Sequence, residues 1–133
     1  MNARILLKGL VPVTVAILLL TTVGCQSVPE EIPEGLSQAE LVQRAQDAAD
    51  VSNWDAAILY YQTILERFPE ERAARMEARY EVAFITYRRG EPQLALRLFQ
   101  EILRDYEEDG EGLPDWPRVL SEVLIEKINA ETE

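Results

Sequence analysis

An internal repeat at a constant offset is the feature that most constrains how this chain folds. The matched positions are Ala45 with Ala83, Ala57 with Ala95, Tyr61 with Phe99, and Ile64-Leu65 with Ile102-Leu103. In each copy the second alanine follows the first at the same spacing, and the aromatic residue lies one helical turn after the second alanine. Self-similarity at a fixed period indicates one supersecondary unit repeated along the chain. We therefore expect two equivalent units.

From Ser37 onward the apolar side chains follow helical spacing, and no segment alternates in the manner of a strand. Ser37 and Glu40 form a capping box at the start of the first expected helix. Pro69 ends the second helix, Gly90 suits a left-handed C-terminal cap, and Pro92 suits a first helical turn. The sequence predicts an all-α domain over residues 38–130, with about five antiparallel helices that begin near residues 38, 53, 70, 92 and 115.

The last expected helix, over residues 115–130, follows a loop rich in acidic residues and glycine at 107–114. Its side chains expected to face inward are Val119, Leu120, Val123, Leu124 and Ile128. This helix would cap the stack of repeats. Because its apolar stripe is wide, it would also leave surface for a partner or for a second copy of the chain.

The repeat resembles the tetratricopeptide repeat, a helix-turn-helix unit of about 34 residues. In that family two small residues let the paired helices approach, an aromatic residue packs the pair, and a proline ends the second helix. The matching positions are Ala45, Ala57, Tyr61 and Pro69 in the first copy, and Ala83, Gly90, Ala95 and Phe99 in the second. Ser52 replaces the turn glycine of the first copy, and Glu107 replaces the closing proline of the second. The resemblance implies repeats at about 38–71 and 76–109.

The same resemblance implies a concave groove lined by the first helix of each repeat. The residues assigned to this partner-binding groove are Tyr80, Phe84, Tyr87, Arg88, Gln43 and Gln46. Aromatic side chains beside an arginine suit the recognition of an extended chain or a partner helix. The alternative is that these aromatics only pack the repeats together.

A second candidate surface is a basic face on the third helix. Arg72, Arg75 and Arg79 are spaced at i, i+3 and i+7 in an otherwise acidic domain. Such a row could grip an acidic partner loop. The alternative is a solvated face paired with neighbouring glutamates.

The only cysteine of the chain, Cys25, directly follows an uncharged apolar run at residues 9–24, which Arg4 and Lys8 precede. This run is shorter than the roughly 20 residues that span a bilayer and suits a secretory signal. The segment resembles a bacterial lipoprotein signal, although Thr22 stands where that family has leucine. The resemblance implies cleavage after residue 24 and lipid on Cys25. An uncleaved anchor and conventional secretion are the alternatives.

Residues 25–37 are expected to form the lipidated cysteine and a flexible tether, because residues 26–37 hold two prolines, one glycine and three glutamates. Fully extended, this segment reaches at most about 40 Å, which would lift the domain clear of the lipid. By resemblance to lipoproteins of diderm bacteria, Gln26 after the cysteine favours the periplasmic face of the outer membrane.

Charge and composition narrow the function. Without residues 1–24 the chain keeps 11 basic and 24 acidic residues, a formal net charge of −13. Such a chain is a poor partner for nucleic acid, which requires clustered cations. The chain has no histidine, and no nucleophile stands near a plausible base, so we expect no catalysis, no metal and no cofactor.

These features predict a non-enzymatic, membrane-anchored lipoprotein that binds other proteins in the bacterial cell envelope, with homo-oligomers as a further possibility. Residues 60–69 resemble the repeat lipoproteins that serve outer-membrane β-barrel assembly. An alternative function is that of an accessory component of a periplasmic transport system. That function predicts a closed pocket among Tyr80, Phe84 and Tyr87.

Overall fold

The structure is a computed structural model that describes residues 27–132 of the 133-residue chain. Cys25 and the predicted signal segment therefore lie outside the described residues. The helices are α2 (Gln38–Asp50), α3 (Trp54–Arg67), α4 (Arg72–Arg88), α5 (Pro92–Asp109) and α6 (Trp116–Thr132). No strand occurs in residues 27–132, so the all-α prediction with five helices is confirmed.

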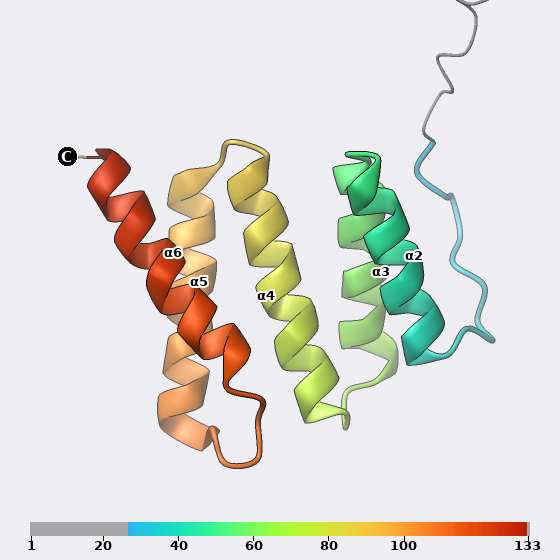
Figure 1. Cartoon of the computed structure of the whole chain (residues 1–133). Coiled ribbons are helices and arrows are strands. Elements are labelled where there is room, and N and C mark those ends of the chain that lie inside the picture. The colour runs from blue at the N-terminus through green and yellow to red at the C-terminus, as the bar shows by residue number, and fades with distance from the viewer. Residues whose placement is uncertain (1–26, 133) are drawn as a thin grey trace, which may run out of the picture.

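Consecutive helices run antiparallel, and each packs mainly against its neighbours in sequence. In Figure 1 α2 lies in front of α3 and α6 lies in front of α5, with α4 between the two pairs. Helix α6 also touches α4. The first helices of the hairpins, α2 and α4, thus share one face of the domain with α6. In the described residues no helix is both long enough and apolar enough to cross a membrane.

The repeat positions form the core. Ala45, Ala57, Ala83 and Ala95 are each 0% exposed. The aromatic position is also buried in both copies, at 3% exposure for Tyr61 and 0% for Phe99. Because alanine adds only a methyl group, it allows the backbones of two helices to approach closely, and the aromatic ring fills the space beside that contact. The constant offset of the repeat therefore marks equivalent packing positions in three dimensions.

The two hairpin turns repeat the same backbone geometry. Ser52 and Gly90, which the repeat offset relates, have positive φ angles of 60° and 83°. The N–H of Ser52 donates to the carbonyl of Ala49 at 2.9 Å, and the N–H of Gly90 donates to the carbonyl of Tyr87 at 3.0 Å. The next N–H in each copy donates to a carbonyl of the preceding helical turn, at 2.8 Å in the first turn and 3.2 Å in the second. Both turns are Schellman C-caps, so the predicted left-handed cap at Gly90 is confirmed.

The end of α5 differs from the expectation. A loop was predicted from residue 107, but α5 continues to Asp109. The first copy ends its second helix just before Pro69, because proline cannot continue a helix. Glu107 at the matching position does not block the helix, and α5 therefore extends further than α3 does.

The inward face of α6 was predicted wrongly for three residues. Val119, Leu120 and Val123 are 43%, 41% and 54% exposed. The face that packs on α5 instead carries the buried residues Pro117, Ser121 and Ile128, together with the partly buried Leu124. Ser121 tolerates complete burial because its hydroxyl donates to the carbonyl of Pro117 at 2.6 Å.

The segment before α2 lies against the domain. The guanidinium of Arg67 donates to the carbonyls of Ile32 and Pro33, at 2.6 Å each. The side chains of Ile32 and Leu36 pack on the core between α2 and α3. Residues 27–37, which fall within the segment predicted as a tether, follow α2 toward the α2–α3 turn (Figure 1). We call residues 27–37 the strap.

The equivalent turns at Ser52 and Gly90 predict opposite effects of two substitutions on stability. Ser52→Gly is expected to raise the free energy of unfolding by about 0.5–1 kcal/mol, because glycine adopts positive φ without a steric cost. Gly90→Ala is expected to lower it by a similar amount, through backbone strain alone, because a Cβ at Gly90 would meet no atom within 4 Å. Urea unfolding followed by circular dichroism measures both values. Equal and unchanged midpoints would contradict the equivalence of the two turns.

Candidate functional site

The aromatic residues of α4 meet α5 and α6 around Tyr80. Its ring stacks on Phe84 at a centroid distance of 6.1 Å and an interplanar angle of 9°. It meets Trp116 of α6 edge to face at 5.1 Å, and Phe99 of α5 at 5.8 Å. Burial, and secondarily the charge of Glu81, raises the pKa of the Tyr80 hydroxyl to about 12. Tyr80 is only 6% exposed, so it packs beneath the surface formed by α4 and α6 and contributes little to that surface.

Phe84 carries the accessible part of the aromatic cluster. The guanidinium carbon of Arg88 lies 5.9 Å from the centre of the Phe84 ring and 5.5 Å from that of Trp54 on α3. These distances fit cation–π contacts. Arg88 is exposed, whereas Phe84 and Trp54 are half-buried. The arginine thus bridges α3 and α4 at the surface.

Tyr87 connects α4 to the C-terminal part of α6. Its hydroxyl lies 3.2 and 3.3 Å from the two carboxylate oxygens of Glu131. The ammonium of Lys127 lies 5.5 Å from the centre of the Tyr87 ring and 4.0 Å from Glu131. Tyr87 therefore takes part in holding α6 beside α4.

An exposed apolar strip lies on α6 next to these aromatics. Trp116, Leu120, Val123, Lys127 and Glu131 are spaced so that they share one helical face. Both ends of that face contact α4, through Trp116 on Tyr80 and through Lys127 and Glu131 on Tyr87. Leu120 and Val123 lie between those contacts and therefore point toward the α4 side, yet they stay exposed because α6 packs chiefly on α5.

We use the name α6 strip for the exposed residues Trp116, Val119, Leu120 and Val123. They are 38%, 43%, 41% and 54% exposed. Four large apolar side chains on adjacent turns of one helix form a contiguous patch, which is informative where a single exposed hydrophobe is not. The sequence predicted that this helix leaves surface for a partner, but Val119, Leu120 and Val123 were assigned to the core. The signal that could have found the site is Ser121, which stands at the same offset from Ala83 as Ala83 does from Ala45 and marks the true packing face.

Helix α4 contributes a mixed face of its own. Glu77, Glu81, Phe84 and Arg88 follow one another at i, i+4, i+7 and i+11 and share one side of the helix. Glu81 is partly buried; that burial, together with the charge of Glu77, raises the pKa of its carboxyl. The face therefore pairs an acidic half with an aromatic and cationic half.

The predicted groove residues of α2 have a different environment. The amide of Gln43 donates to the carboxylate of Asp47 on the same helix at 2.8 Å. Gln46 is exposed. No described hydrogen bond joins Gln43 or Gln46 to the aromatic residues of α4. The predicted groove set therefore divides into a buried Tyr80, half-buried Phe84 and Tyr87, and exposed Arg88, Gln43 and Gln46.

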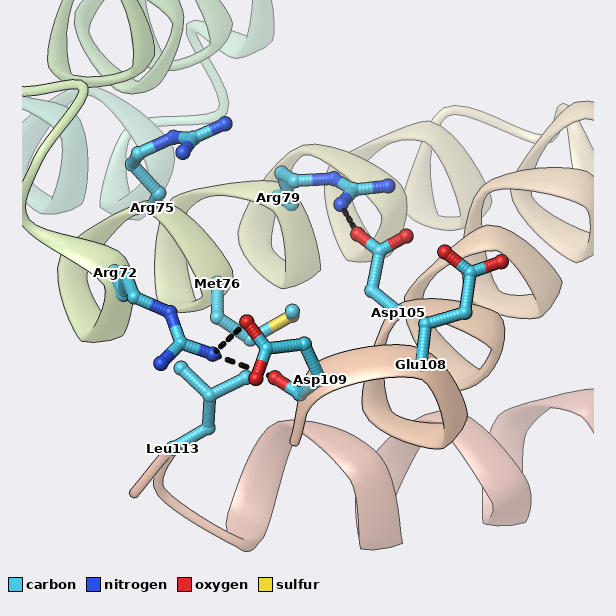
Figure 2. A pocket seen from close by; sticks show the side chains of 8 residues that line it. All are labelled: Arg72, Arg75, Met76, Arg79, Asp105, Glu108, Asp109 and Leu113. Carbon is cyan, nitrogen blue, oxygen red and sulfur yellow. Dashed lines mark hydrogen bonds and ion pairs between the residues drawn. The ribbon is translucent and has the colours of Figure 1, made fainter. Parts of the chain in front are cut away.

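The predicted basic face on α4 is largely neutralised by α5, as Figure 2 shows. Arg72 forms an ion pair with Asp109 at 3.0 Å, and Arg79 is paired with Asp105. Arg75 instead donates to the carbonyl of Pro69 at 3.0 Å. The arginines and acids line a shallow cavity of about 210 Å³. Its charge is internally balanced, so a paired face fits better than a free basic surface.

Residues 27–132 contain no group of three or more histidine, cysteine, aspartate or glutamate side chains placed to hold a metal ion. The acidic residues of the loop after α5 belong to no such group. Tyr106, near the end of α5, donates its hydroxyl to the carbonyl of Pro114 at 2.5 Å and ties α5 to the residues just before α6.

Comparison with known proteins finds a relative of unknown role. An uncharacterized protein of Treponema pallidum (strain Nichols) is 39% identical over 89 residues. The match covers 65% of this chain but only 36% of the relative, so it spans little more than a third of that protein's length. No known protein-family model matches the sequence, and no solved structure matches it. The chain is thus similar to part of a longer protein.

The environment of Glu81 predicts that the stability of the folded domain depends on pH. Because its folded-state pKa is raised above the usual value of 4.5, the folded state carries the cost of a desolvated carboxylate at neutral pH. This cost is relieved as the pH falls through the folded-state pKa toward 4.5. Glu81→Gln is therefore expected to raise the urea midpoint at pH 7, with a gain that shrinks on acidification.

The matched control is Glu66→Gln on α3, where the side chain is exposed and no stabilisation is expected. Urea midpoints between pH 4 and pH 8 give the comparison. A gain for Glu81→Gln that is independent of pH would show that burial of the charge is not its cause.

Proposed function

We propose that this chain is a non-enzymatic lipoprotein of the bacterial envelope, whose tetratricopeptide-like domain binds another protein across α4 and α6. The repeat architecture supports the proposal, because the first helices of such repeats line a binding face. The buried alanines at equivalent repeat positions and the equivalent turns at Ser52 and Gly90 fit this class of domain. The domain would then be a rigid support for a surface that recognises a partner.

The observation that carries the proposal is the α6 strip. Helices α2 and α4 are each covered by the helix that follows them, whereas no helix among residues 27–132 covers the strip on α6. Exposing four large apolar side chains together is unfavourable unless a partner covers them. A helix of a partner protein, laid along α6, would bury them in the manner of helix-in-groove recognition.

The charge of the neighbouring α4 face indicates the chemistry of that partner. Glu77 and Glu81 flank the apolar surface, and neither forms an ion pair with a basic side chain in the described part of the chain. A Lys or Arg beside the apolar residues of the partner would meet these carboxylates and offset the cost of burying Glu81. We therefore propose an amphipathic helix with basic residues along one edge as the bound segment.

Location and anchoring belong to the same proposal. Lipid on Cys25 would hold the domain at a membrane, at the periplasmic face of the outer membrane, where the partner would be another envelope protein. A role in outer-membrane protein assembly agrees with the resemblance of residues 60–69 to repeat lipoproteins of that process. The absence of histidine from the sequence supports a binding role over a catalytic one.

The alternative role as an accessory of a transport system has less support. It needs a closed pocket among Tyr80, Phe84 and Tyr87, but the Tyr80 ring is packed against Phe84, Phe99 and Trp116. Tyr80 therefore belongs to the packed interior, with only 6% of its surface exposed.

A charge placed in the α6 strip tests the binding face. Val123→Glu is expected to weaken binding at least tenfold, because a carboxylate would have to be buried against the apolar edge of the partner. Asn129→Glu is the matched control, since it adds the same charge to an exposed position of α6 that points away from the strip. The probe is a synthetic helical peptide with a leucine stripe and lysines along one edge, titrated by fluorescence anisotropy.

Both variants are expected to keep the melting temperature of the parent protein, because both sites are exposed. Equal affinities of the two variants would contradict the proposed face. A photo-crosslinking residue at position 119 in cells then identifies the natural occupant. An adduct with twice the mass of the chain would show that a second copy covers the strip, and would overturn the proposal of a different protein.

A further inference from the structure

The strap changes where the domain must stand relative to its proposed lipid anchor. The side-chain amide of Asn53, in the α2–α3 turn, donates to the carbonyl of Ser27 at 3.4 Å. Ser27 follows Cys25 with only Gln26 between them, and two peptide units reach at most about 7 Å. A lipid on Cys25 would therefore begin within that reach of Ser27, close to the α2–α3 turn. The much longer reach expected of a free tether is not available while the strap is docked.

Arg67 is the main fixed point of the strap. It donates two charge-assisted hydrogen bonds to the successive carbonyls of Ile32 and Pro33, and the apolar side chains of Ile32 and Leu36 pack on the core. These contacts fix the end of the strap nearest α2. From there the chain runs toward the α2–α3 turn, as Figure 1 shows, and delivers Ser27 to Asn53.

The end of the domain reached by the strap carries exposed apolar side chains. Val28 and Val51 are 42% and 53% exposed there. The α4–α5 turn lies at the same end, because Arg89 in that turn pairs with Asp55 in the first turn of α3 at 2.8 Å. Leu94, in the first turn of α5, adds a third exposed apolar side chain at 38%. We call this end, with Val28, Val51 and Leu94, the strap end.

Acidic side chains lie at both ends of the domain. At the strap end Arg89 pairs with Asp55 and Glu91, at 2.8 and 3.3 Å, and Asp50 beside Val51 is exposed. The opposite end carries four acidic residues around the α5–α6 loop, Glu107, Glu108, Asp109 and Glu111, of which Asp109 is paired with Arg72. Helix α5 has 18 residues and separates the two ends by about 27 Å. That distance exceeds the Debye length of about 8 Å at physiological ionic strength, so the acidic loop would not be repelled by an anionic lipid surface at the strap end.

We propose that the strap end is a membrane-contacting surface, on which Val28, Val51 and Leu94 rest against the lipid head groups while the acidic loop points away. This inference rests on the proposed lipid on Cys25. The occupant is the bilayer itself, because the strap delivers the anchor to this end and because exposed apolar side chains lie there. The contact is weak by itself and gains its effect from the anchor, which raises the local concentration of the surface.

Site-specific labelling reads this orientation directly. Lipid on Cys25 blocks the only native thiol, so Val51→Cys and Glu111→Cys each provide a single reactive site in the full-length protein. Each variant is labelled with an environment-sensitive fluorophore and bound to vesicles of phosphatidylethanolamine and phosphatidylglycerol that carry a head-group spin label. We expect at least threefold stronger quenching at position 51 than at position 111. Equal quenching at the two positions would overturn the proposal.

A second variant tests whether the strap sets the orientation of the domain. Arg67→Ala removes both hydrogen bonds to the carbonyls of the strap. It is expected to lower quenching at position 51, because a released strap no longer holds the α2–α3 turn close to the lipid. Flotation with the vesicles is expected to stay unchanged. Arg104→Ala is the matched control, because Arg104 is exposed on α5 and makes no described hydrogen bond or ion pair. Unchanged quenching in Arg67→Ala would show that the strap does not set the orientation.

Failure of the anchor is separated from failure of the orientation by flotation and by the mass of the N-terminal peptide. If Cys25 carries no lipid, the unmodified chain does not float, and the proposed anchoring is wrong. The orientation is then read on a chain in which a hexahistidine tag replaces residues 1–25 and binds nickel-chelating lipid. Quenching at position 51 above that at position 111 in this chain supports the strap end as the lipid-facing surface, and equal quenching rejects it.

Discussion

Close contact between helices at small side chains is the constraint on which the rest of the structure depends. At Ala45, Ala57, Ala83 and Ala95 no larger residue would leave the backbones at their present separation. These contacts set the angle of each hairpin and thereby place α4 where α6 can reach its aromatics. The partner face proposed for α4 and α6 is thus a consequence of packing deep in the domain, and a change at an alanine would displace that face without touching it.

Most of the fold could be predicted from the sequence because its determinants are local. Ser37, Gly90 and Pro92 mark helix ends through backbone chemistry that depends on a few neighbours, and the structure places them as expected. Ser52 departs from the glycine of the repeat pattern, yet its backbone takes the same left-handed conformation as Gly90. The turn geometry is therefore imposed by the hairpin, and the side chain of Ser52 adapts to it.

The site was less predictable because it depends on which face of α6 is buried. Apolarity alone favoured Val119 and Val123 for the core, since serine is counted as polar. The structure buries Ser121 instead, because its hydroxyl is satisfied within its own helix and its small size suits close packing on α5. Small size is the property shared by Ala45, Ala83 and Ser121, and hydrophobicity is not. The strap was hidden for a similar reason: Arg67 holds it through backbone carbonyls, which carry no sequence signature.

The two proposed surfaces place different demands on the same domain. The strap end would be tied to the lipid, and α4 and α6 extend from that end toward the acidic loop. A partner helix lying along α6 would then stand upright from the membrane, with Trp116 meeting its outer end and Lys127 its inner end. Such a partner could approach from the aqueous side without displacing the anchor. The acidic loop, turned outward, would meet basic segments first and would raise their rate of encounter with Glu77 and Glu81 through long-range attraction.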